Sequence, residues 1–215
     1  MAIFRLDRRI IIPNKRPWGW EDVDAPLYKV FFNHRYSDLT GYDTALISLL
    51  EDVRAEVDYA DTVPDITFED YNILIIGAPG DDWVSSHPEG DRIQNAQCSV
   101  ISFCRGVSRN TLTMGDSSSS TNVSSFTLVE SHADFNTEAG GDIDCGPSMS
   151  THQIWSLHED TVLVYHRGSS GNAGFAYRKP QENQYYIHFG YHGIDQATDE
   201  LKELLANTIT YLGGL

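Results

Sequence analysis

The chain has 215 residues, of which 40% are hydrophobic and 21% charged, a balance that suits one soluble globular domain with a sizeable core. Its formal net charge of −16 and its pI near 4.6 describe a surface that repels nucleic acid and anionic membranes, so we expect neither as a partner. No apolar run approaches the length of a membrane span.

Residues 1–26 are expected to form an extended N-terminal arm ahead of a single domain over residues 27–215. The first 16 residues hold five of the 15 basic side chains and only one of the 31 acidic ones. The segment PNKRPWGWEDVDAP cannot form a long helix because it contains three prolines and a glycine. Its two tryptophans are costly to leave in water, so we expect the arm to lie on its own body or on a neighbour.

A basic arm on an acidic body predicts docking onto a second copy of the chain or onto another acidic protein. The alternative is that the charges only keep a floppy end soluble. The expected partner-binding residues are Arg5, Arg8, Arg9, Arg16, Trp18 and Trp20.

The first half of the domain has the pattern of a parallel α/β sheet. YKVFFNH (28–34) is typical of a buried strand, and TALISLLEDVRAEV (44–57) has helical spacing with Asp43 or Thr44 as the N-cap. Further strands are expected in VDYADT (57–62), NILIIG (72–77) and CSVISFC (98–104). The order β-α-β-β-β with apolar runs predicts parallel pairing.

The second half is expected to begin irregularly and to end in hairpins and a helix. DSSSSTNVSS (116–125) and HADFNTEAGGDIDCGPS (132–148) have the composition of exposed loops. TVLVYHR (161–167), NAGFAYRK (172–179) and YYIHFGYH (185–192) are expected as successive antiparallel strands. ATDELKELLANTITYL (197–212) predicts a closing amphipathic helix.

The cysteines and the N-terminus bear on the compartment. Cys98, Cys104 and Cys145 form no Cys-x-x-Cys pair, so we expect no metal site and reduced thiols. The apolar stretch before Pro13 is only three residues long, too short for the core of a signal peptide. We therefore expect a cytoplasmic protein or a component of an assembled particle.

Two expected strands end in residues suited to acyl chemistry. DYNILIIGAPGDD ends in Gly-Ala-Pro-Gly, and CSVISFCRG ends in Cys-x-Gly. The carboxyl ends of neighbouring parallel strands are where sites form in open sheets. A glycine-rich turn can hold an oxyanion on its amides, and Ser102 and Gly106 are small enough for a tight elbow around Cys104.

With these segments in this order, the chain resembles the class I glutamine amidotransferase-like superfamily, a flavodoxin-like fold. DYNILIIGAPGD is similar to the family's strand and oxyanion turn, SFCRG to its Gly-x-Cys-x-Gly elbow, and YYIHFGYHGIDQATDELKELLANTITYL to its last strand, histidine turn and closing helix. The resemblance implies a mostly parallel three-layer α/β sheet, with antiparallel hairpin strands near the C-terminus.

The same resemblance implies Cys104 as nucleophile, His192 as base and Asp195 as the residue that orients it, with the amides of Gly77 and Arg105 as oxyanion donors. The chain departs from the family at these positions: Ser102 replaces the first elbow glycine, and His-Gly-Ile-Asp replaces the family's His-Pro-Glu turn. The segment after Cys104, GVSRNTLTMG, is poor in helix formers and is equally suited to a strand or a loop.

Three functions stay open on the sequence, none of which needs a cofactor. The first is a non-catalytic structural or assembly protein, such as a virion component, that docks through its arm. The second is a cysteine-dependent amidase or glutaminase using Cys104 and His192. The third is a small-ligand or carbohydrate-binding module, for which Trp83 and Trp155 are candidate walls.

Overall fold

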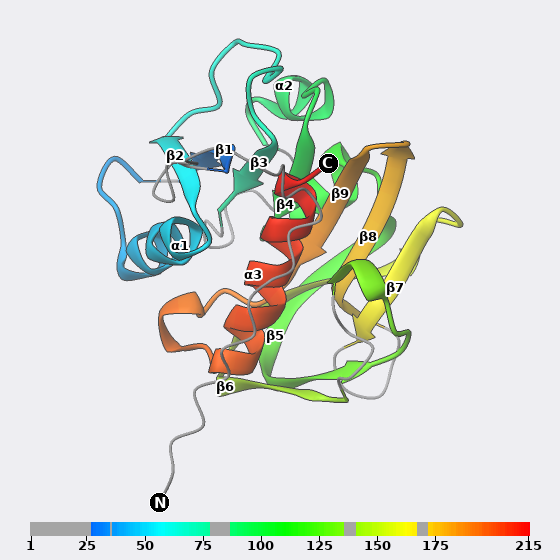
Figure 1. Ribbon diagram of the computed structural model, residues 1–215. Helices are drawn as coiled ribbons and strands as arrows, with labels where there is room; N and C mark the ends of the chain where they lie inside the picture. The colour runs from blue at the N-terminus through cyan, green and yellow to red at the C-terminus, as the bar shows by residue number, and fades with distance from the viewer. Residues whose placement is uncertain (1–26, 35, 78–86, 136–140, 167–171) are drawn as a thin grey trace, which may run out of the picture.

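The computed structural model describes residues 27–34, 36–77, 87–135, 141–166 and 172–215. Within them, nine strands form one mixed sheet in the order β2-β1-β3-β4-β9-β8-β6-β5-β7, and β7 also pairs with β8 (Figure 1). No helix in this part of the chain is long and apolar enough to cross a membrane. The expected arm, with its six partner-binding residues, lies outside the described residues.

The elements follow one another along the chain as a parallel α/β half and then an antiparallel half. The first half comprises β1 (Tyr28–Asn33), α1 (Gly41–Asp52), β2 (Ala55–Ala60), β3 (Ile73–Ile76), α2 (Gly90–Gln94), β4 (Ser99–Ser102) and η2 (Val107–Thr111). The second comprises β5 (Gly115–Leu128), η3 (Ala133–Phe135), β6 (Ile143–Leu157), β7 (Thr161–His166), β8 (Ala173–Gln181), β9 (Gln184–Phe189), η4 (Ile194–Gln196) and α3 (Asp199–Gly213).

The parallel part of the sheet, which also includes β9 from the second half of the chain, confirms the expected fold class. The strands β2, β1, β3, β4 and β9 pair in parallel, in the order that flavodoxin-like sheets use. Alternate residues of these strands point to opposite faces, and each face has its own apolar cluster. The cluster containing Phe32 and Ile75 packs against α1 and α3, whereas the one containing Phe31 and Leu74 packs against α2 and η2. The result is three layers.

The helices confirm the expected segments with shifted ends. Helix α1 begins three residues before the expected segment because Thr40 is its N-cap and forms a capping box with Asp43. It ends at Asp52, and Arg54 then adopts a positive φ of 65° before β2 begins. In the last helix, α3, the Thr198 hydroxyl accepts a hydrogen bond from the Leu201 amide, and the apolar stripe is buried as predicted.

The antiparallel half is larger than the composition predicts. Residues 116–125, expected as a loop, lie inside β5, and the end of the second expected loop lies inside β6. These two strands pair over most of their lengths, from Gly115 opposite Leu157 to Phe126 opposite Ile143. Serine is a weak strand former by itself, but pairing and same-face packing decide strand formation more strongly than propensity does.

Candidate functional site

The candidate site lies where the carboxyl ends of β3, β4 and β9 meet, beside the middle of β6. Gly77 follows β3, the sequence Phe103-Cys104-Arg105 follows β4, and His192 follows β9. These strands are neighbours in the sheet, so the structure brings four of the five predicted site residues to one edge. Residues 78–80 of the Gly-Ala-Pro-Gly turn lie outside the described residues.

A serine hydroxyl closes the turn that carries Cys104. Ser102 Oγ donates a hydrogen bond to the carbonyl oxygen of Cys104 at 2.9 Å and accepts one from the Cys104 amide at 3.2 Å. The non-glycine residues of positive φ in the described chain are Arg54, Phe68, Thr113 and Ser156, so Cys104 does not have a left-handed backbone. Ser102 therefore has a definite role where the family has glycine: it ties the turn together.

The thiol of Cys104 is buried. Only 1% of the residue is exposed, and it belongs to the apolar cluster under α2 and η2, with Val107 and Met114. The other two cysteines are also buried thiols, and none of the three forms a disulfide. Burial raises the pKa of Cys98 and of Cys145 to about 12, which keeps these two thiols protonated and unreactive near neutral pH.

Two histidines meet at the carbonyl group of Phe103. His192 Nε2 lies 3.1 Å from this oxygen, and His152 Nδ1, from β6, lies 3.0 Å from it. The rings are perpendicular with their centroids 3.8 Å apart. Burial, with a contribution from His192, lowers the pKa of His152 to about 2, so His152 is neutral near pH 7. His192 thus directs its Nε2 at a backbone oxygen one residue before Cys104.

Of the two amides expected to hold an oxyanion, that of Gly77 already has a partner. It donates to the carbonyl oxygen of Asn33 at 2.9 Å. The Arg105 amide lies 3.2 Å from His152 Nδ1, which can accept this bond only in the tautomer without a proton on Nδ1, and that tautomer cannot donate from Nδ1 to the Phe103 carbonyl oxygen. The Cys104 amide is bound to Ser102, as described above. An oxyanion hole requires amides that point into open space at the reacting atom, and the amides of Gly77 and Cys104 do not provide it.

Asp195 is separate from this group. It is exposed on η4, and its carboxylate accepts a hydrogen bond from Gln196 Nε2 at 3.5 Å. Among the described residues, no hydrogen bond joins Asp195 to His192. The Asp195 carboxylate instead lies beside the start of α1, 3.9 Å from where a Cβ on Gly41 would be.

His152 is the site residue that sequence reasoning missed. It lies in a segment with no recognisable motif, and its place depends on Gly190, whose carbonyl accepts the His152 amide hydrogen bond at 2.7 Å. A Cβ at Gly190 would overlap the carbonyl oxygen of His152, so glycine is required for β6 to approach this closely. Residues 151–156 show no alternation of apolar and polar side chains, so the sequence carries no strand signal at His152.

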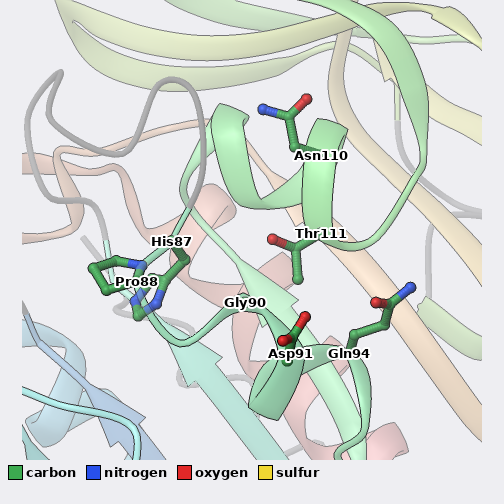
Figure 2. A pocket seen from close by; sticks show the side chains of 7 residues that line it. All are labelled: His87, Pro88, Gly90, Asp91, Gln94, Asn110 and Thr111. Atoms are coloured by element: carbon green, nitrogen blue, oxygen red, sulfur yellow. The ribbon is translucent and has the colours of Figure 1, made fainter.

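A separate cavity of about 230 Å³ lies between α2 and η2 (Figure 2). Asp91, Gln94 and Thr111 point toward it, and its remaining lining residues are His87, Pro88, Gly90 and Asn110. His87 is held in place, because its Nε2 lies 3.0 Å from Asn33 Oδ1 and its Nδ1 accepts the Glu89 amide at 3.1 Å. The lining residues include a carboxylate and carboxamides but no lysine or arginine.

Of the two candidate tryptophans, Trp155 alone lies within the described residues. Trp155 is half-buried in β6 and does not line the cavity, and Trp83 lies outside the described residues. In the described ranges, no group of three or more His, Cys, Asp or Glu residues is arranged to hold a metal ion.

Comparison with known proteins gives likeness in structure only. No family model matches the chain, and no curated protein matches it in sequence. A ThuA-like protein from Bacteroides uniformis is similar over 92% of this chain and 95% of its own, with a TM-score of 0.62 and 11% identity. SMU.1228c is similar over 86% of this chain and 98% of its own, with a TM-score of 0.56 and 13% identity.

PurLQS from Thermotoga maritima is similar over 87% of this chain and 99% of its own, with a TM-score of 0.51 and 13% identity. At these identities the likeness establishes the fold and not the activity. The chain shares a mixed α/β fold with these proteins.

Proposed function

We propose that this protein is a non-catalytic assembly protein that uses an amidotransferase-like domain as a rigid body and docks through its N-terminal arm. The closed elbow is the observation that carries the first half of this proposal. A nucleophile must be accessible and a base must reach it, whereas the Cys104 thiol is 1% exposed and His192 Nε2 lies against the Phe103 carbonyl oxygen.

The charge distribution supports the second half. Five basic residues and two tryptophans occur in the first 20 residues, and the remainder of the chain carries all but one of the 31 acidic side chains. Such an arm is suited to an acidic protein surface, where tryptophans supply buried area and arginines pair with carboxylates.

Labelling of the native protein with iodoacetamide at pH 7.5, followed by intact-mass measurement, tests the absence of a reactive thiol. We expect every cysteine to react slowly until urea unfolds the chain, because all three are buried. Cys98→Ser, which removes a buried thiol from the same apolar cluster, is the matched control for Cys104→Ser. A fast single adduct that disappears in Cys104→Ser and slows in His192→Ala would establish a paired thiolate and refute the proposal.

Removal of residues 1–26 tests the docking half separately. Light scattering of the full chain and of the truncated chain is expected to show loss of association in the truncated protein. Identical masses for the two, with or without an acidic partner, would contradict docking through the arm and leave the thiol result unaffected.

The cavity between α2 and η2 supports a second candidate function, the binding of a small polar ligand. Its lining is rich in oxygen atoms and contains one carboxylate, so it is suited to binding a hydroxylated molecule or one that carries an ammonium group. The carboxylate would repel an anionic ligand. Gly90→Val would fill the cavity beside Thr111, whose Oγ1 lies 3.4 Å from the Cβ position. In an NMR titration with a panel of monosaccharides and primary amines, we expect a binding compound to change the chemical shifts of Gln94 in the wild type and not in this variant. If no compound changes them in the wild type, this second candidate function is refuted.

A further inference from the structure

The strand β2 forms an outer edge of the sheet. In the described part of the chain it pairs only with β1, and Figure 1 shows it at the end of the parallel half, beside α1. The backbone groups on its other side are therefore directed away from the sheet. A six-residue edge of this kind is a template for a further strand.

The two faces of β2 differ in chemistry. Glu56 and Asp58 share one face, with 57% and 46% of their side chains exposed, and both lie near Lys29. Val57 and Tyr59 share the other face, where Val57 is half-buried and Tyr59 is 50% exposed. The carboxylates disfavour pairing of β2 with a second β2, because like charges would then lie opposite one another. They favour a strand that carries basic residues.

The arm contains a segment with the matching pattern. An extended strand over residues 8–12, Arg8-Arg9-Ile10-Ile11-Ile12, would place its side chains alternately on two faces. Arg9 and Ile11 would then lie on the face of Glu56 and Asp58, while Arg8, Ile10 and Ile12 would lie on the face of Val57 and Tyr59. Pro13 follows at once, which is where an edge strand of this length can end.

We propose that the outer edge of β2 receives residues 8–12 from the arm of a second copy of this chain as an added strand. This inference rests on the proposed assembly function and adds to it the surface on which the arm would dock. The described chain starts at Leu27, whose amide donates to the carbonyl oxygen of Arg54, at the amino end of β2. The 14 residues 13–26 that precede it can span up to roughly 46 Å when extended, which is long enough to reach a neighbouring subunit.

Reciprocal exchange of two arms would use the same contact twice and close a symmetric dimer. Each chain supplies one basic strand and one acidic edge, so the contact is self-complementary without any further component. The exposed part of Tyr59 would be covered in the dimer. The carboxylates of Glu56 and Asp58, which lie 3.9 Å and 2.9 Å from Lys29 Nζ, would gain Arg9 as a further partner.

Light scattering with sedimentation velocity on charge-reversed full-length chains tests this contact. Glu56→Lys/Asp58→Lys reverses the edge, Arg8→Glu/Arg9→Glu reverses the arm, and Glu159→Lys/Glu182→Lys is the matched control on exposed turns away from β2. We expect a dimer in the wild type and in the control. Each reversed variant alone is expected to dimerise more than about tenfold more weakly, and an equimolar mixture of the two is expected to regain the dimer because both contacts become attractive again.

The outcomes separate this inference from the proposed function. If the dimer persists when the charges of the β2 edge are reversed but dissociates when residues 1–26 are removed, then the arm docks elsewhere. That result would support docking through the arm and would refute β2 as the surface that receives it. A monomeric wild type would overturn the second copy as the occupant. Circular dichroism on each variant checks folding, and the arm variant keeps the test decisive if the edge variant unfolds, because its substitutions lie outside the domain.

Discussion

Lowering the pH from 7 to 5 is expected to destabilise the folded protein, because His87, His152 and His188 are buried without charge. They are 4%, 1% and 0% exposed. Burial lowers the pKa of His87 and of His188 to about 4, and the pKa of His152 is about 2. The Nδ1 atom of His188 is 2.9 Å from Ser108 Oγ, and this contact holds the ring under η2.

The sign and the size of the effect follow from proton linkage. Between the unfolded pKa of about 6.5 and the lower folded pKa, the unfolded chain binds more protons, so the free energy of unfolding falls as the pH falls. Over the roughly 1.5 units from pH 6.5 to pH 5, at 1.36 kcal/mol per unit, each histidine costs about 2 kcal/mol. Together the three would remove about 6 kcal/mol, a large part of the roughly 5 to 15 kcal/mol that is typical of a domain.

Urea unfolding at pH 7, 6 and 5, followed by tryptophan fluorescence, measures this dependence. His188→Gln is expected to lose about a third of the pH dependence, because one of the three titrating rings is gone while a polar side chain remains beside Ser108. His158→Gln removes an imidazole whose side chain is 38% exposed and controls for the loss of a histidine as such. An unchanged free energy of unfolding between pH 7 and 5, or a full wild-type slope in His188→Gln, would refute the reasoning.

Three further changes test the packing that positions the site. Leu205→Ala leaves a cavity under α3 and is expected to cost about 2 to 5 kcal/mol in urea unfolding, and a loss below 1 kcal/mol would contradict its burial at 0% exposure. Gly190→Ala places a methyl group on the carbonyl oxygen of His152 and is expected to abolish cooperative unfolding, whereas Gly214→Ala, with its nearest atom at 3.6 Å, is expected to leave it unchanged. Thr40→Ala removes the capping box of α1 and is expected to lower the free energy of unfolding by about 1 kcal/mol, which equal urea midpoints would disprove.

Local patterns were sufficient to predict the parallel half of the fold. Ile73–Ile76 are apolar on both faces, and the strand after Cys98 has Val100 and Ile101 on opposite faces, which fits a sheet covered on both sides. The spacing of Leu201, Leu204 and Leu205 likewise fixes the buried stripe of α3. In these segments the period of the side chains and the burial they require agree, so pattern and structure coincide.

Whether Cys104 is accessible depended on contacts between distant segments. The elbow motif is visible in SFCRG, but its closure needs the Ser102 hydroxyl in one rotamer and His152 from β6, 47 residues beyond Arg105. The strand that carries His152 begins in a segment whose composition favours a loop.

The sequence by itself determined which residues follow the parallel strands at the site edge, and the side-chain pattern that buries both faces of those strands. Only the tertiary structure decided which backbone amides at that edge already have hydrogen-bond partners. It also decided that β5 and β6 are strands. The physical reason is that both outcomes depend on pairing partners far along the chain, whose proximity no local propensity encodes.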